Sequence, residues 1–203
     1  MKADVSVATK GRPREFCTDM ALAAALRVFW TKGYEGASLT DLTDAMGITR
    51  PSLYAAFGNK EELFRKALDL YEREKLAYMR EAIAAPTARA VAETLLRGAL
   101  MMQTSDCDPH GCLRVISSVA CGVEAESIRA EVIARRQSSH NALLKRFEQA
   151  EAAGELPQGM NAEGLTAFLS ALLQGLSLQA GAGASREELE HLVETSLKLW
   201  PTR

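Results

Sequence analysis

Apolar residues recur at helical spacing along nearly the whole chain, and no segment shows the strict alternation of a half-buried strand. The first such segment runs from Glu15 to Lys32, and Gly33 is the kind of residue that ends a helix. The same spacing predicts further helices over residues 39–46, 50–57, 59–84, 86–103, 112–121, 124–153, 161–180 and 185–200. The pattern therefore predicts an all-α protein.

Three short helices near the N-terminus are separated by local start and stop signals. Ser38 and Asp41 have the spacing of a capping box, and Gly47 ends the helix that they open. Thr49 is placed to cap the next helix. Two helices joined by a tight glycine turn are typical of a helix-turn-helix, whose second helix enters the major groove of DNA. Residues 39–46 are then the supporting helix and residues 50–57 the reading helix.

The polar residues of this region have the chemistry of DNA contacts. Arg50 can donate two hydrogen bonds to a guanine, and hydroxyl groups on and beside the reading helix can bind phosphates or base edges. The side chains expected at DNA are Ser38, Thr40, Thr49, Arg50, Pro51, Ser52, Tyr54 and Lys60, together with Arg12 and Arg14 of a basic arm that fits a minor groove. Short capped helices also occur in ordinary helical hairpins, and a basic arm can be a merely soluble tail. Both alternatives stay open on spacing alone.

The segment "GYEGASLTDLTDAMGITRPSLYAAFGNKEELFRKAL" resembles the DNA-binding unit of the TetR/AcrR family of regulators. The resemblance implies a homodimer that binds a palindromic operator on double-stranded DNA and lets go when a small molecule fills the C-terminal domain. One departure is Ala55-Ala56, where many members carry aromatic or histidine residues after the tyrosine. This departure shifts more of the readout onto Arg50, Ser52 and Tyr54.

The chain divides into an arm with a helix-turn-helix domain over residues 1–58 and a helical domain for ligand binding and dimerisation over residues 59–203. A helical bundle of this size can hold a pocket for an unknown small-molecule effector. Candidate lining residues on its middle helices are Leu100, Met101, Cys112, Val115, Ser118 and Leu144. For each of them, ordinary core packing is the alternative.

The motif Cys107-x-x-His110-x-Cys112 offers a second route to regulation. A thiol at a helix N-terminus is more reactive, and two thiols with an imidazole can hold a soft metal. A thiol- or metal-responsive regulator is therefore the alternative function, although Cys112 can also simply pack. No cofactor and no metal ligand are assigned from the sequence.

The helix over residues 161–180 is apolar nearly all round, so a partner should cover part of it. The resemblance implies that this helix and the last one form a four-helix interface with a second copy. The residues expected there are Phe168, Leu169, Leu172, Leu173, Leu176, Leu192, Leu197 and Trp200.

Composition excludes other classes of protein. The chain has 203 residues, a formal net charge of −2 and four cysteines, and its N-terminus has no apolar stretch typical of a secretory signal. We therefore expect a cytoplasmic protein with reduced thiols and no membrane partner. Three histidines and the lack of a glycine-rich phosphate loop disfavour an enzyme. An architectural DNA binder without an effector is a further alternative, which a pocket in the bundle would disfavour.

Overall fold

The computed structural model describes residues 18–119, 122 and 125–200, and these form helices joined by turns and loops, with no strand. The helices are α1 (Thr18–Gly36), α2 (Leu39–Met46), α3 (Arg50–Phe57), α4 (Lys60–Glu74), α5 (Ala77–Ile83), α6 (Ala88–Gln103), α7 (Leu113–Val119), α8 (Glu126–Ala152), α9 (Ala162–Gly181) and α10 (Arg186–Leu199). The all-α expectation is confirmed. None of these helices combines the length and the apolar composition needed to cross a membrane.

Gly33 interrupts the first helix, as expected from the sequence, but the helix resumes after it. Gly33 has a φ of 71° and a ψ of 174°, and the remaining turn of α1 continues to Gly36. A positive φ is readily adopted by glycine because it has no Cβ. The kink brings Tyr34 against Phe29 and Phe64, with ring centroids 6.3 and 5.2 Å away.

The single helix expected over residues 59–84 is wrong, because the structure divides it into α4 and α5. No glycine or proline marks the break at Lys75 and Leu76. The turn buries the side chain of Leu76 in the core. It also places Lys75 Nζ 2.6 Å from Asp108, in the loop that follows α6. Tertiary contacts therefore accompany a break that local sequence does not announce.

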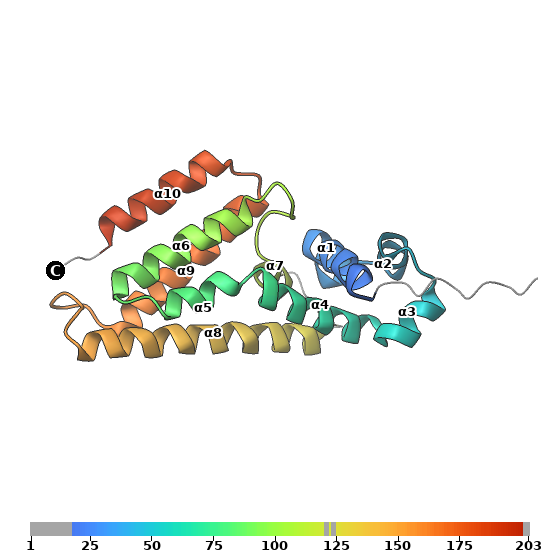
Figure 1. Ribbon diagram of the computed structural model, residues 1–203, viewed down its shortest axis with the longest axis horizontal. Helices are drawn as coiled ribbons and strands as arrows, with labels where there is room; N and C mark the ends of the chain where they lie inside the picture. The colour runs from blue at the N-terminus through green and yellow to red at the C-terminus, as the bar shows by residue number, and fades with distance from the viewer. Residues whose placement is uncertain (1–17, 120–121, 123–124, 201–203) are drawn as a thin grey trace, which may run out of the picture.

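The molecule has two clusters of buried apolar side chains, one in the core of each end. The first cluster joins α1–α4 to parts of α7 and α8, and the second joins α6, α9 and α10 to the second half of α8. Figure 1 shows α8 running beneath α5 and α6 as far as α4, with α3 at one extremity of the molecule and α10 over the opposite end. Helix α8 therefore contributes side chains to both clusters, Ile128 and Val132 to the first and Leu143, Phe147 and Ala150 to the second.

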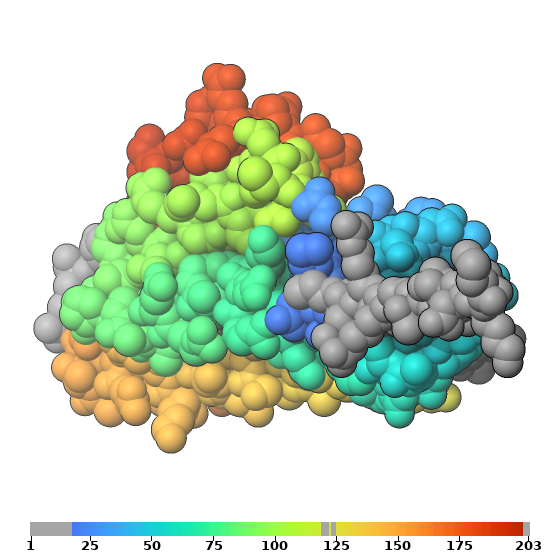
Figure 2. All heavy atoms as spheres, turned by 45° about the vertical axis from the view of Figure 1, so that its right-hand side comes forward, coloured from blue at the N-terminus to red at the C-terminus, as the bar shows by residue number. Residues whose placement is uncertain are grey.

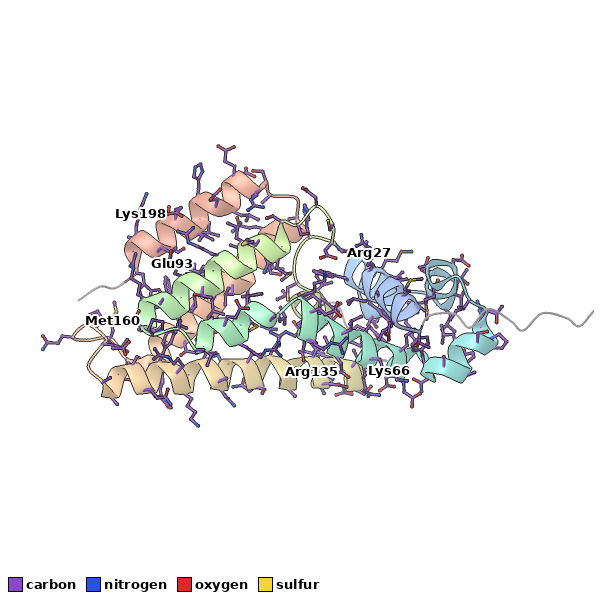
Figure 3. All side chains as sticks on the ribbon, viewed as in Figure 1. Arg27, Lys66, Glu93, Arg135, Met160 and Lys198 are labelled. Carbon is purple, nitrogen blue, oxygen red and sulfur yellow. The ribbon has the colours of Figure 1, made fainter. Side chains whose placement is uncertain are left out.

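Arg135 ties the middle of α8 to α4 through charge. Its guanidinium lies 2.6 Å from Asp69 and 3.1 Å from Glu72, both on α4, and 2.6 Å from Glu131 on its own helix. Figure 3 shows Arg135 between the two helices. Arg135, Glu72 and Glu131 are partly buried, so solvent weakens the attraction between them less than it weakens that of surface pairs, whereas Asp69 is exposed.

The loop of residues 104–112, which follows α6, is fastened to α1. The indole Nε1 of Trp30 donates a hydrogen bond to the Gly111 carbonyl at 3.1 Å, and this contact is buried. Arg27 donates to the carbonyl of Cys107 and lies 3.4 Å from the Asp108 carboxylate (Figure 3). Asp108 thus lies between Arg27 of α1 and Lys75 at the end of α4. This loop forms a second connection between the two ends of the molecule.

Candidate functional site

Helix α2 is fixed at its N-terminus by reciprocal hydrogen bonds. The Asp41 amide donates to Ser38 Oγ at 3.0 Å, and the Ser38 amide donates to Asp41 Oδ2 at 3.0 Å. Lys32 Nζ lies 2.6 Å from the same carboxylate and so links α1 to α2. Gly47 ends α2 in the left-handed conformation, with a φ of 65°. The predicted capping box therefore fixes the start of α2, and the predicted glycine turn joins α2 to α3.

Helix α3 presents one face to the core and one to solvent. Thr49 caps it, and Pro51 occupies its first turn, where a missing N–H is harmless. Leu53 and Phe57 are buried, whereas Tyr54 is 50% exposed. Arg50 and the two alanines that follow Tyr54 are also exposed. The outward face of α3 therefore has the shape and the side chains of a reading helix.

Arg50 is held in place from the neighbouring helix. Its Nη2 donates a hydrogen bond to Thr40 Oγ1 on α2 at 2.9 Å. Guanidinium carries five N–H donors, so this contact leaves most of them available. The bond limits the rotamers of a long side chain, which would lower the entropy lost if Arg50 binds a base.

Lys60 lies at the start of α4, where helix amides also face outward. Its Nζ is 4.5 Å from the centre of the Tyr34 ring, a cation–π contact. Partial burial lowers the pKa of Lys60 from its ordinary value. The ammonium group is thus held beside the capped N-terminus of α4, where it can meet a phosphate.

The eight described candidates for DNA contact lie on α2, α3 and the first turn of α4, at one end of the molecule (Figure 1). The hydroxyls of Ser38 and Thr49 are occupied as helix caps, so these two residues position the helices. Figure 2 shows the blue and cyan segments that contain α1–α3 on the right of the molecule and the red C-terminal helix at its top. Arg12 and Arg14 lie outside the described residues.

Acid should weaken the α1–α2 junction through Asp41. The hydrogen bond from Lys32, followed by those from Ser38, lowers the pKa of Asp41 from 3.8 to about 2. A depressed carboxyl pKa gives stability that is present above the ordinary pKa and is lost as pH falls toward the folded value. Asp41→Asn should therefore flatten the dependence of the unfolding free energy on pH between 3.8 and about 2. Urea unfolding at several pH values measures this. The control is Asp44→Asn, an exposed substitution in the same helix; equal slopes in both variants would contradict the assignment.

A cavity of about 720 Å³ lies inside the helical domain. Its lining comes from α5, α6, the start of α7, the middle of α8 and α9. Of the residues expected to line a pocket, Cys112 and Val115 do so. Leu100 and Leu144 instead pack in the second apolar cluster, and Ser118 lies just beyond the lining, bonded to Arg136. Met101 is the clearest error: it lies on α6, does not line the cavity and is 64% exposed.

The three residues of the predicted thiol or metal motif do not act as a group. Cys107 and His110 are exposed, whereas Cys112 is buried and accepts a hydrogen bond from the Tyr71 hydroxyl at 3.2 Å. Burial raises the pKa of Tyr71 well above its ordinary value, so this hydroxyl stays a donor. In the described part of the chain, no three His, Cys, Asp or Glu side chains are grouped to hold a metal. The structure therefore does not group Cys107, His110 and Cys112 as metal ligands.

The residues expected at a dimer interface divide into two sets. Leu169, Leu176, Leu197 and Trp200 are buried within the single chain, and Leu173 lines the cavity, so none offers a free apolar surface. Phe168 is 45% exposed, while Leu172 and Leu192 are partly exposed. Leu178 on α9 and Leu199 on α10 are more exposed, at 55% and 74%. Residues 168, 171, 175 and 178 have the spacing of one helix face. This spacing is the pattern in the sequence that could have identified the exposed residues of α9.

Two family profiles match the sequence. One, for bacterial regulatory proteins of the tetR family, matches residues 21–67, and the other, for the tetracyclin repressor-like C-terminal domain, matches residues 90–196. The chain is 35% identical over 196 residues to the HTH-type transcriptional repressor ComR of Escherichia coli (strain K12), covering 95% of this chain and 93% of ComR. It is 33% identical over 182 residues to the HTH-type transcriptional repressor BdcR of the same strain, covering 88% and 86%.

Solved structures give the same answer for the fold. A cysteine mutant of the TetR family transcriptional regulator CifR, in complex with 26-bp double-strand operator DNA, superposes with a TM-score of 0.86. It is 43% identical in sequence, and the match covers 94% of this chain and 100% of the CifR chain. A TetR family regulator from Agrobacterium tumefaciens, 21% identical, superposes with a TM-score of 0.78 and covers 91% and 97%.

Proposed function

Because the chain belongs to the TetR family of bacterial regulatory proteins, and is thus a DNA-binding regulator rather than an enzyme, we propose how it is controlled. It is a homodimeric repressor that binds a palindromic operator and releases it when a small organic ligand fills the cavity. The relatives ComR and BdcR are named transcriptional repressors, and the CifR structure contains operator DNA. These findings support the repressor and operator parts of the proposal.

The observation that carries ligand control is the position of the cavity. Cys112 and Val115 line it and also belong to the first apolar cluster, which packs around α1 and α4. A ligand that shifts the start of α7 therefore changes contacts with the DNA-reading end. A ligand alters DNA affinity only by binding the two shapes of the protein unequally. The cavity also disfavours an architectural DNA binder without an effector.

A two-fold dimer matches the expected operator. Two reading helices related by a two-fold axis meet half-sites in successive major grooves, so a palindrome reflects the symmetry of the protein. The exposed apolar residues of α9 and α10 are the surface that we assign to the partner. On this proposal, residues 1–58 read DNA and residues 59–203 bind the ligand and the second copy.

A thiol switch is the second candidate, because Cys112 lies in the cavity wall and Cys107 is exposed on the loop bound to α1. Oxidation or alkylation of Cys112 would add atoms in the cavity, and modification of Cys107 would act on the loop. Neither route needs the two thiols to meet.

One experiment tests the proposal and separates the candidates. Operator DNA is first selected with purified protein. Its complexes with wild type and with the double variant Cys107→Ser, Cys112→Ser are then treated with candidate compounds. Small organic compounds should release both proteins if the cavity acts by occupancy alone. Peroxide or an electrophile should release only wild type if thiols act. Some compounds will raise the melting temperature of the protein and so bind it. If none of these compounds releases either protein from the operator, ligand control is contradicted.

A further inference from the structure

The charged residues that line the cavity all carry the same sign. Arg80, Arg114 and Arg136 line it, together with His140, and none of the described lining residues is an aspartate or a glutamate. A hollow lined by charges of one sign, with walls of low dielectric constant, concentrates the electrostatic potential inside it. The interior therefore favours a negatively charged occupant.

Arg114 is an unusually buried cation, with 8% of its residue surface exposed. Its Nη1 lies 3.2 Å from Glu72, but the other oxygen of this carboxylate lies 3.1 Å from Arg135. Among the described residues, the hydrogen-bond contact of Arg114 Nη2 is the thioether of Met79, at 3.5 Å. Sulfur is a weak acceptor, so this edge of the guanidinium retains hydrogen-bonding capacity.

Arg136 reaches the same wall from the middle of α8. Its Nη1 donates to Ser118 Oγ at 2.8 Å, and Ser118 in turn donates to the Val115 carbonyl at 2.9 Å. No carboxylate of the described residues forms an ion pair with Arg136 or Arg80. Ser139, which accepts from Arg114 at 3.0 Å, also lines the cavity from α8. Two guanidinium groups therefore meet this wall from α7 and α8.

The rest of the cavity gives the occupant its other features. Leu76, Leu95, Leu143 and Leu173 supply apolar walls. Gln103 also lines the cavity and is 3% exposed, and its side-chain oxygen has no hydrogen-bond partner among the residues that the structure describes. A buried acceptor without a partner is costly, and a donor on a ligand would satisfy it.

We propose that the cavity binds an organic acid. The acid group pairs with Arg114 and Arg136, the apolar body lies against the leucines, and a hydroxyl or N–H group can donate to Gln103. This inference rests on the proposed function, because it names the chemical class of the releasing ligand. A charge-assisted contact to a planar guanidinium also distinguishes an acid from a neutral compound of the same shape.

Two dyes with the same apolar body test the inference. Anilinonaphthalene sulfonate carries an acid group, and phenylnaphthylamine is its counterpart without the sulfonate. Wild type should bind the sulfonate about tenfold more tightly than the neutral dye, since a charged hydrogen bond of about 1.4 kcal/mol corresponds to a factor of ten. Arg136→Gln should remove this preference and leave the affinity for the neutral dye unchanged. Fluorescence titration at fixed salt concentration measures both affinities.

Arg129→Gln is the matched control, because Arg129 is an exposed arginine of the same helix and does not line the cavity. It should keep the wild-type preference. Equal binding of the two dyes to wild type, or an unchanged preference in Arg136→Gln, would overturn the inference. In either case, release of the operator by neutral compounds would leave the proposed function intact. If the preference appears as expected but no organic acid releases the operator, the assignment of the cavity stands and ligand-controlled release fails.

Discussion

Leu178→Glu is expected to convert the proposed dimer into monomers and to reduce operator binding by several orders of magnitude. Leu178 is 55% exposed in the single chain, and Gly175, one turn before it, has open space where a side chain would stand. This part of α9 can therefore approach a second helix closely. An unpaired charge buried in an apolar interface costs about 3–5 kcal/mol, and a two-fold interface contains it twice.

Light scattering and operator titration measure the two effects of Leu178→Glu. Met101→Glu is the control, because it places the same charge on an exposed residue of α6. It should remain dimeric and bind the operator as wild type does. The buried Leu176 is unsuitable for this test, since a glutamate there would disrupt the single chain itself. A Leu178→Glu protein that stays dimeric at micromolar concentration would show that this face of α9 is not the interface.

Arg50→Ala is expected to lower operator affinity by roughly 5- to 150-fold for each half-site, because a bidentate contact to guanine contributes about 1–3 kcal/mol. Arg50 begins α3, is exposed, and is held toward the outer face by Thr40. In a dimer the loss occurs at both half-sites. A mobility-shift titration at one fixed salt concentration gives the affinity.

Two further variants make the result of Arg50→Ala specific. Arg73→Ala removes an arginine of α4 whose side chain is 66% exposed. This variant should bind the operator with nearly wild-type affinity. Thr40→Ala removes the internal partner of Arg50 but leaves the guanidinium, so its effect should be smaller than that of Arg50→Ala. Wild-type affinity in Arg50→Ala would show that α3 reads DNA without this residue.

The helix-turn-helix could be predicted because its signals are local. The Ser38–Asp41 box, the turn at Gly47 and the Thr49 cap each act within a few residues, and the structure contains all three. The break between α4 and α5 could not be predicted, because it involves Lys75 meeting Asp108, a residue far along the chain. Local propensity carries no information about such a contact.

The cavity was only partly predictable, for the same reason. Its lining contains arginines but no described aspartate or glutamate, because the fold brings Arg114 of α7 and Arg136 of α8 to one wall. Neither arginine belongs to a sequence motif. On α9, the apolar residues extend around the helix, so periodicity cannot separate Leu176, which is buried, from Leu178, which is exposed. Packing against α6 and α8 decides this.

The contacts between α1 and the loop of residues 104–112 limit how the protein can be re-engineered. A hybrid that joined residues 18–58 to the effector domain of another regulator would separate Trp30 from Gly111 and Arg27 from Asp108. The buried indole N–H of Trp30 would then need a new acceptor, and the grafted helices would sit on a surface of different shape. Exchange of ligand specificity between relatives should therefore transfer α1 and this loop as a matched pair, even though they lie some eighty residues apart in the chain.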